Sequence, residues 1–452
     1  MGHVRRMGAL AAVAALTFAA GCTSESAGDD DDAASTQTTA AGDDTGAATG
    51  AGNTAGITDT TIKISLLSSD LSALSEQNLA PEIGSADATM KAVVADINAN
   101  GGVAGRQIEL VSHVIPGAEA IVNPDAGRQA CVQATEDDQP FAVILAASLP
   151  ASMVQCVAQD HDPLTITMDS WPDSLYAAAD GRLFSVGSQI SVGMSRLFSA
   201  WPGILDDAGA LEGKTVGIIR QDTLSNDQKD AVDNSLKPAL ETLGYEVAAE
   251  AVLPCPETSQ TCEQHQAAIQ RMQDAGVDFV FLVAQTLAGS TTVETAQSSG
   301  YKPTWATVGN NVTPTVAKFY TNARDNYEGA WGLSVDFTDF TEAAANCNRI
   351  AVAGGADEFP TSSDGYGFTG VTCLQMQILA QAIDRVDGSL DQASVIAALE
   401  SLGDDVPAIS GGPTSLSKDK HDAGNAVFVA RYSAATEKFE PVDDRKPVEV
   451  PE

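Results

Sequence analysis

The sequence has 452 residues, and its 61 Asp and Glu against 24 Lys and Arg give a formal net charge of −37. This charge argues against a nucleic-acid partner and against attachment to anionic lipid through a basic face, since both need clustered Lys and Arg. It does not exclude a small anionic ligand, because such a ligand responds to the local field of a cleft. The length predicts two or three domains, and 44% hydrophobic residues are enough for a buried core.

The N-terminus has the pattern of an export signal. Arg5 and Arg6 precede an uncharged run, Met7–Gly21, which suits the apolar part of a signal peptide and is too short to span a bilayer. The run ends Ala19-Ala20-Gly21-Cys22, and small residues before a cysteine resemble a bacterial lipobox. We therefore predict a signal peptide over 1–21 and a lipid anchor on Cys22 at the outer face of the cytoplasmic membrane. The alternative is an ordinary signal peptidase site with an incidental Cys22.

Residues 22–56 are predicted to form a disordered, lipidated linker. The segment Thr23–Gly56 contains no Val, Ile, Leu, Met or aromatic residue, so nothing can be buried to offset the entropy of ordering. Its acidic run Asp29–Asp32 could alternatively bind calcium, but it lacks the glycine-bounded loop and distal Glu of such sites.

After the linker, the sequence alternates strand and helix patterns. Met90, Val93, Val94 and Ile97 share one helical face, and Asn100-Gly101-Gly102 supplies a helix stop. A second helical face runs over 268–275, and the predicted strands are 61–67, 108–114, 141–146, 164–168, 215–220, 279–283 and 304–308. Continuous apolar strands separated by helices predict an α/β protein with parallel sheets covered on both faces. The alternation is too long for one sheet of five or six strands, so two Rossmann-like lobes are predicted.

With Cys22 assigned to lipid, an even number of six cysteines remains, which in an exported protein predicts disulfides. Six cysteines allow 15 pairings. The sequence places them as three neighbouring pairs, so we expect Cys131–Cys156, Cys255–Cys262 and Cys347–Cys373. The alternative is a zinc site of Cys255, Cys262 and His265, although the sequence has no CxxC pair.

The stretch Asp96–Arg106, which reads DINANGGVAGR, and the opening Ile57–Ile64 closely resemble the branched-chain amino acid type of solute-binding protein. The resemblance implies the type I periplasmic binding protein fold, with two lobes joined by a three-strand hinge. By element order the hinge strands would lie near 184–187, 329–336 and 426–433. Lobe one would then cover 57–186 and 336–426, and lobe two 187–335 and 427–445. It also implies a small-molecule ligand and ABC permease subunits as partners.

Ligands of open α/β sheets bind beyond the carboxyl ends of the strands, which directs attention to the turns there. Two turns of lobe one carry Ser148 with Leu149, and Ser170 with Trp171. Pro150 and Pro172 follow at positions suited to N1 of a helix, and Ser170 with Asp173 resembles a capping box. Two helix N-termini suit a carboxylate, and the resemblance implies that these turns hold the ligand's carboxylate. Alternatively, both serines only cap helices, and Trp171 belongs to the core.

The equivalent turns of lobe two are Asp222–Asn226, Gln285–Leu287 and Gly309–Asn311, from which we select Asn226, Gln285 and Asn310 as ligand contacts. Amino-acid-binding relatives have a carboxylate near the third turn and tyrosines at the other two, and this sequence has neither. An unpaired buried ammonium is costly, so an ordinary amino acid ligand is in doubt unless Asp169 or Asp222 supplies the charge.

Motifs of catalysis are absent: the sequence contains no GxSxG, no HExxH and no P-loop. Gly365–Gly370 matches GxGxxG, but turn-forming residues rather than a strand precede it, and we expect a plain amphipathic helix from Val371 onward. We predict no enzyme, no cofactor and no metal, and a monomeric receptor of an ABC importer for a polar or amino-acid-like solute. The alternatives are a ligand-sensing lipoprotein of the same fold and a secreted enzyme with an unrecognised site.

Overall fold

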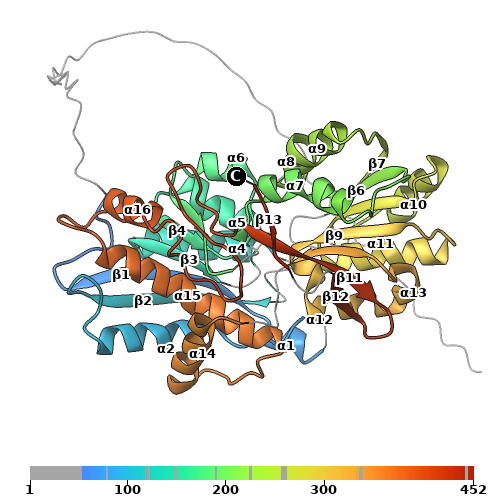
Figure 1. Ribbon diagram of the computed structural model, residues 1–452. Coiled ribbons are helices and arrows are strands. Elements are labelled where there is room, and N and C mark those ends of the chain that lie inside the picture. Colours follow the sequence, from blue (N-terminus) through green and yellow to red (C-terminus); the bar gives the residue numbers. More distant parts are fainter. Residues whose placement is uncertain are drawn as a thin grey trace, which may run out of the picture. The chain divides into compact units, whose positions relative to one another are not determined.

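The structure is a computed structural model in which residues 52–452 form one compact unit (Figure 1). It describes residues 53–451 except 78–79, 118, 120–122, 147–148, 150, 189–190, 223–226, 256–261, 335–339 and 443–445. No helix within these described residues is both long enough and apolar enough to cross a membrane.

The first sheet is parallel and has the strand order β2-β1-β3-β4-β5. Its strands are β1 (Thr61–Asp70), β2 (Gln107–Pro116), β3 (Ala142–Ala146), β4 (Leu164–Thr167) and β5 (Leu183–Ser185). The intervening helices are α1 (Ser72–Ser75), α2 (Ala86–Ala99), α4 (Pro124–Val132), α5 (Ala151–Gln155) and α6 (Asp173–Ala178), and π-helical turns η1 (Gln133–Asp137) and η2 (Cys156–Asp160) extend α4 and α5. Every residue of β3 and β4 is buried, as expected for central parallel strands.

The second sheet has the order β12-β11-β10-β9-β8-β6-β7, with β13 paired to β11. Its strands are β6 (Val216–Asp222), β7 (Val247–Pro254), β8 (Phe279–Val283), β9 (Thr304–Val308), β10 (Trp331–Ser334), β11 (Ala426–Ser433), β12 (Lys438–Pro441) and β13 (Val448–Glu449). Strands β6 to β10 are parallel, whereas β11 runs antiparallel to β10, β12 and β13. Its main helices are α7 (Met194–Asp207), α8 (Asp227–Ala231), α9 (Lys237–Thr242), α10 (His265–Asp274) and α11 (Thr286–Ser298), with η4 (Val232–Leu236) between α8 and α9. After β9 come η5 (Gly309–Val312), α12 (Pro314–Ala317), η6 (Lys318–Ala323) and α13 (Arg324–Tyr327).

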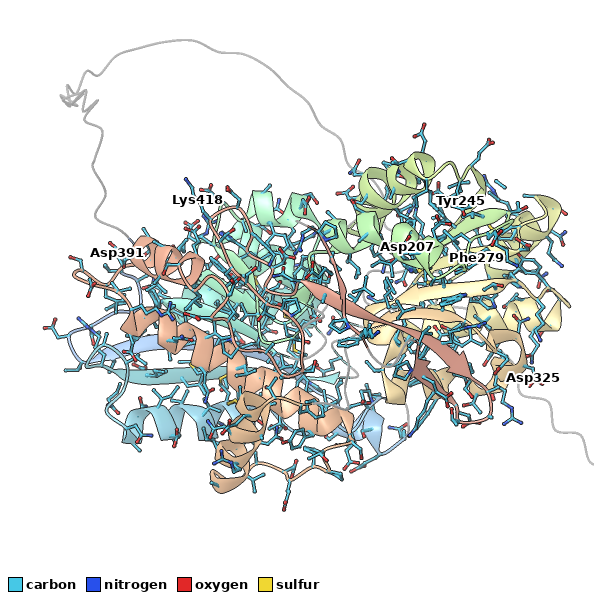
Figure 2. All side chains as sticks on the ribbon, viewed as in Figure 1. Asp207, Tyr245, Phe279, Asp325, Asp391 and Lys418 are labelled. Carbon is cyan, nitrogen blue, oxygen red and sulfur yellow. A yellow bond between two sulfur atoms is a disulfide. The ribbon has the colours of Figure 1, made fainter. Side chains whose placement is uncertain are left out.

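Each sheet has a buried hydrophobic cluster on either face, so the protein has two α/β lobes. Figure 2 shows Phe279 among the strands of the second sheet, while the exposed Asp325 and Lys418 are at the surface. The larger cluster of the first lobe joins residues 62–186 with residues 344–423 from much later in the chain. Those later residues belong mainly to α14 (Glu342–Ala353), α15 (Asp364–Asp384) and α16 (Gln392–Glu400). Helices α14 and α15 both contact α2 (Figure 1).

The chain passes three times between the two sets of clusters. It leaves the first lobe after Val186 and enters the second at Val192; it returns after Leu333 and leaves again between Ala423 and Val427. The first and third passages lie side by side, because Ser185 N donates to His421 O at 2.9 Å and Ala423 N donates to Ser185 O at 2.8 Å. The ring of His421 also stacks on Phe184, with centroids 4.1 Å apart.

The GxGxxG stretch is helical, and the expectation that the helix starts near Val371 is wrong. Helix α15 begins at Asp364, and the Ser363 hydroxyl caps it by accepting from Tyr366 N. Gly365 is needed there because a Cβ would lie 2.4 Å from the ring of Phe359. These glycines therefore allow close packing of a buried helix.

Candidate functional site

The carboxyl ends of β1, β3, β4 and β5 meet at one edge of the first sheet, because neighbouring strands are parallel. Side chains with hydroxyl groups are concentrated there. Ser68 pairs in register with Ala146, and Thr167 pairs with Ser185. Ser68, Thr167 and Ser185 are all buried, and the Ser185 hydroxyl lies 2.7 Å from the Tyr176 hydroxyl. This edge is therefore polar, although the strands that lead to it are apolar.

The turn after β4 is fastened to the first passage between the lobes. The Ser170 hydroxyl donates to Val192 O, the Ser191 hydroxyl donates to Met168 O at 3.1 Å, and Met194 N donates to Trp171 O at 2.7 Å. The backbone of Asp169 donates to the Thr167 hydroxyl at 3.3 Å. A ligand that contacts this turn would therefore act directly on the segment that joins the lobes.

The predicted capping box at this turn is wrong. Helix α6 begins at Asp173, and Pro172 is its N-cap rather than N1, with extended backbone angles and no side-chain cap. The Ser170 hydroxyl is engaged by Val192 O, and Asp173 N donates to the Ser195 hydroxyl at 3.0 Å. The helix has only six residues, so its dipole is small and the structure does not support the anion-binding helix N-terminus that the sequence suggested.

Trp171 belongs to the core. It is 5% exposed and packs in the cluster formed by Leu145, Leu175 and neighbouring residues, against which Leu149 also packs. Its indole nitrogen donates to the Thr167 hydroxyl at 3.5 Å. The side chain thus supports the turn and leaves little surface for a ligand.

Asp169 differs from its neighbours because its carboxylate has no partner among the described residues. The residue is half-buried, and burial raises the pKa of its carboxyl to about 6. A carboxylate held in this way at the edge of the first sheet is the most unusual electrostatic feature of the site.

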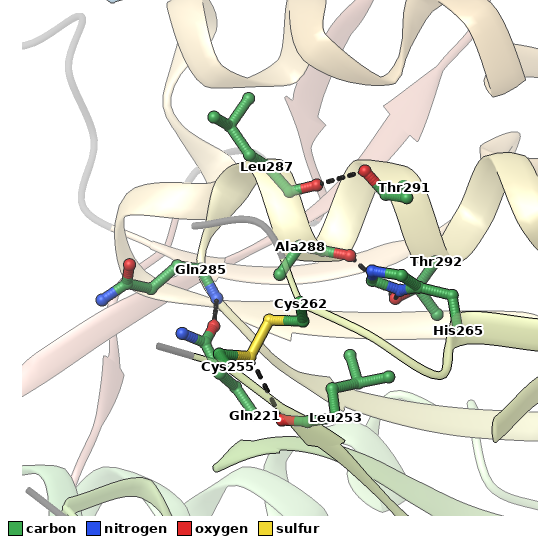
Figure 3. Close-up of a disulfide and its surroundings, with 10 residues drawn as sticks. All are labelled: Gln221, Leu253, Cys255, Cys262, His265, Gln285, Leu287, Ala288, Thr291 and Thr292. Carbon is green, nitrogen blue, oxygen red and sulfur yellow. Dashed lines mark hydrogen bonds between the residues drawn. A yellow bond between two sulfur atoms is a disulfide. The ribbon is translucent and has the colours of Figure 1, made fainter. Parts of the chain in front are cut away.

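Amide side chains line the corresponding edge of the second sheet. Gln221, at the end of β6, is buried, and its Oε1 accepts from Gln285 N at 2.9 Å (Figure 3). Asn311 Nδ2 donates to Ala284 O at 2.8 Å, and its Oδ1 accepts from the Thr286 hydroxyl at 3.3 Å. These bonds link the ends of β6, β8 and β9. Gln285 itself is exposed at the N-cap of α11 and its side chain makes no cap bond there. Its side-chain amide is therefore accessible to a ligand at this edge.

Asp222 is the last residue of β6, and its negative charge is paired with Arg220. Arg220 donates to the Asp222 carboxylate at 3.2 Å and to the Glu250 carboxylate at 2.9 Å. Lys237 pairs with Glu250 in turn, which lowers the pKa of Glu250 against the effect of its own burial. Asp222 is therefore part of an ion-pair network, in contrast to Asp169.

The structure joins the six cysteines in the pairing expected from the sequence: Cys131–Cys156, Cys255–Cys262 and Cys347–Cys373. This excludes the zinc alternative in the structure, because the sulfurs of Cys255 and Cys262 are bonded to each other and offer no thiolate (Figure 3). His265 instead places Nδ1 2.9 Å from the Thr292 hydroxyl, and burial lowers the pKa of its ring. His161 lies near the Cys131–Cys156 sulfurs, which are equally unavailable to a metal.

Three predicted residues fall outside the described part of the chain: Cys22, Ser148 and Asn226. Asn310 lies in η5, but its side chain is also outside that part. Conversely, sequence reasoning missed Gln221 as a member of the second edge. Its signal was available, because Gln221 lies in the polar run Arg220–Asp222 that ends β6 after its apolar start.

Comparison with known proteins gives one family and many similar structures. The sequence model of the periplasmic binding protein family matches residues 61–437. A branched-chain amino acid ABC transporter protein from Thermus thermophilus with bound valine is 14% identical, with 86% of this chain and 97% of that chain covered and a TM-score of 0.61. A fatty acid ABC transporter substrate-binding protein from Thermomonospora curvata is 18% identical, with 88% and 94% covered and a TM-score of 0.61.

A solute-binding protein of an ABC transporter from R. palustris, in complex with 4-hydroxybenzoate, is 16% identical, with 86% and 96% covered and a TM-score of 0.59. At these identities the likeness establishes a shared fold. Among curated proteins, none matches the sequence significantly.

Proposed function

The chain belongs to the periplasmic binding protein family, and from this premise we propose that it is the extracytoplasmic receptor of an ABC importer. It captures a small polar or amino-acid-like ligand between its two lobes. One observation carries the proposal: the sheets of both lobes end in clusters of polar side chains, Thr167–Ser170 in one lobe and Gln221, Gln285 and Asn311 in the other.

The mechanism follows from the connections between the lobes. Three passages of the chain can act as a hinge, which lets two packed lobes move with little loss of core packing. A ligand that contacts both lobes stabilises the closed state by its differential affinity for that state. The turn after β4 is bonded to the first passage at Val192 and Met194, so ligand contact at Ser170 is coupled to the hinge. Permease subunits then recognise the closed form.

Ligand contacts are proposed at Ser148, Leu149 and Ser170 in lobe one and at Asn226, Gln285 and Asn310 in lobe two. Trp171 contributes by supporting the turn rather than by contact, since it is almost fully buried. We keep the lobe limits proposed from the sequence, 57–186 with 336–426 and 187–335 with 427–445. The relatives with bound valine and 4-hydroxybenzoate suggest the size range of the ligand.

The proposed location is the outer face of the cytoplasmic membrane. The signal peptide 1–21 directs export, Cys22 carries the lipid, and residues 22–56 tether the receptor at the membrane surface. The folded part acts as a monomer and needs no cofactor.

The proposal is tested by identifying what the purified protein binds. Ligands that copurify with residues 53–452 are released by unfolding, identified by mass spectrometry, and titrated back by calorimetry. We expect a stoichiometric small molecule whose binding is lost in Ser170→Trp, because the bulky ring displaces the Val192 contact at the edge of the first sheet.

The matched control is Ser298→Trp. Ser298 is exposed near the end of α11, and this substitution should leave affinity unchanged. Full affinity in Ser170→Trp, or turnover of the bound compound, would contradict the receptor assignment.

A further inference from the structure

Asp169 carries the carboxylate of the turn that follows β4. Its backbone is held on both sides, since Met168 O accepts from the Ser191 hydroxyl and the Ser170 hydroxyl donates to Val192 O. The carboxylate nevertheless forms no hydrogen bond and no ion pair with any residue that the structure describes. A half-buried carboxylate on a fixed turn therefore has no partner in the described part of the chain.

Between residues 53 and 442, no basic side chain forms an ion pair with Asp169. Every Lys, Arg and His between residues 53 and 442 lies in the described part of the chain, because the internal segments left out of it contain none. The turn after β3, residues 147–150, and the passage over 186–193 contain no titratable residue. The described residues Ser191, Val192 and Met194, in and next to the passage, are bonded to the turn, and none of them carries a charge.

The charged groups on the other elements packed near the turn are already engaged or are acidic. Helix α6 contributes Asp173, which is exposed, and Tyr176, whose hydroxyl meets Ser185. From α7, Arg196 forms an ion pair with Asp422 and donates its remaining N–H groups to the chain around it. Beside Asp422, Lys420 Nζ donates to Ser415 O at 2.7 Å, and His421 Nε2 lies 3.1 Å from Glu400.

Asp222 is the other carboxylate at a strand end that could serve a ligand, and it differs in one decisive respect. Arg220 already donates to it at 3.2 Å, and the Asp222 side chain is 42% exposed to water. Its charge is therefore both paired and hydrated. Asp169 is less exposed than that and has no partner among the described residues, and a partly buried charge without a partner is unfavourable unless something binds to it.

We propose that Asp169 is the counter-ion for a protonated amine of the ligand, so that the solute is a small amine-bearing molecule held from lobe one. This inference rests on the proposed function and specifies its ligand class. The hydroxyls around Thr167 and the amides around Gln285 then bind the neutral polar parts of the solute. The same arrangement disfavours a ligand that places a carboxylate beside Asp169, since two like charges repel.

The proposal carries a pH dependence whose sign is fixed. Burial raises the pKa of the Asp169 carboxyl to about 6, and the amine binds only the ionised form, while a primary amine stays protonated over this range. Affinity is therefore highest above pH 6 and decreases as the pH falls through that value. Between pH 7.5 and pH 5.0 the ionised fraction falls about tenfold, and the affinity is expected to fall by about the same factor.

The test is affinity selection from two defined pools, detected by mass spectrometry. One pool contains primary amines, namely amino acids and diamines, and the other contains carboxylic acids and alcohols without nitrogen. Each is incubated at pH 7.5 with the wild type, with Asp169→Asn, with the rival Asp222→Asn and with the control Asp173→Asn. Asp173 is the exposed first residue of α6, four residues after Asp169, and its substitution makes the same change of charge.

We expect retention from the amine pool, at least tenfold weaker binding in Asp169→Asn, and less than threefold change in Asp173→Asn and Asp222→Asn. Retained amines should bind the wild type about tenfold more weakly at pH 5.0, and this dependence should disappear in Asp169→Asn. Circular dichroism melting of each variant verifies folding, and the pH series on the wild type gives a measurement that needs no variant.

The outcomes separate the inference from the proposed function. Retention from the nitrogen-free pool alone would overturn the amine assignment and leave the receptor function standing. A tenfold loss in Asp222→Asn with none in Asp169→Asn would transfer the role to Asp222 and overturn the inference. Retention from neither pool would count against both the inference and the receptor function.

Discussion

The contact between Arg196 and Asp422 gives the sharpest prediction about stability. The two side chains are 14% and 7% exposed and come from segments 226 residues apart. Arg196 Nε donates to Pro451 O at 3.0 Å and Nη2 donates to Val450 O at 2.8 Å, while Nη1 reaches Gly424 O at 3.2 Å. One guanidinium thus joins α7, the third passage between the lobes and the C-terminal segment.

Removing one partner of a buried ion pair leaves the other charge uncompensated, at a cost of about 3–5 kcal/mol. We expect Arg196→Met to lower the free energy of unfolding by about this amount, since Met keeps the apolar stem and, among the described residues, only the Gly193 N–H still donates to Asp422. Asp422→Asn should cost less, about 1.5–3 kcal/mol, because the amide oxygen still accepts a hydrogen bond. The double variant should be destabilised by less than the sum of the two.

The assay is urea unfolding followed by circular dichroism, with disulfides intact. Lys91→Met is the control, because its pair with Asp87 is an exposed i,i+4 contact worth at most about 0.5 kcal/mol. If Arg196→Met unfolds within about 1 kcal/mol of the wild type, or if the two single variants are additive, the reasoning about a buried and coupled pair is refuted.

Three further predictions concern the C-terminus, the disulfides and the anchor. Deleting residues 446–452 removes β13 and two acceptors of Arg196, so unfolding should become easier by about 2 kcal/mol or more; an unchanged melting temperature would show that the segment is passive. Replacing Cys347 and Cys373 by Ser should cost about 3 kcal/mol, and replacing Cys255 and Cys262 should cost less, since those pairs close segments of 26 and 7 residues; the reverse ranking in urea unfolding would contradict the loop-entropy argument. A fatty-acid probe should label the full-length protein and not Cys22→Ser in cells, and labelling that survives the substitution would eliminate the lipoprotein assignment.

The strands were the most predictable part of the fold. The limits expected for β8 and β9, 279–283 and 304–308, agree with the structure, because these strands are short runs of apolar and β-branched residues between turn residues. The end of β1 was set too early at Leu67. The strand continues to Asp70 through Ser68 and Ser69, which are buried in spite of their polarity and therefore break the apolar pattern.

The remaining differences arise from contacts between distant segments. The start of α15 was misread because Gly365 suggests a turn, whereas the residue is required by the ring of Phe359. Ser170 was read as a helix cap because its partner Val192 lies 22 residues away. The pair of Arg196 and Asp422 could not be predicted, since a single sequence gives no information on which charges meet across 226 residues.

The edges of the two sheets were found in part. Turns after apolar strands are a general signal for ligand contacts in α/β folds, and they led directly to Ser170 and Gln285. The sequence could not show which side chains in those turns form ion pairs, because that depends on which residues meet in the fold. Asp169 and Asp222 look equivalent in the sequence, and only the structure shows that Arg220 is committed to Asp222.

The central claim is that ligand binding closes two lobes about a hinge, and small-angle X-ray scattering tests it most directly. The scattering of residues 53–452 is recorded without ligand, with saturating copurified ligand, and with the same ligand and Ser170→Trp. The account predicts a smaller radius of gyration on ligand addition to the wild type and no change in the variant. An unchanged radius of gyration in the saturated wild type would contradict it.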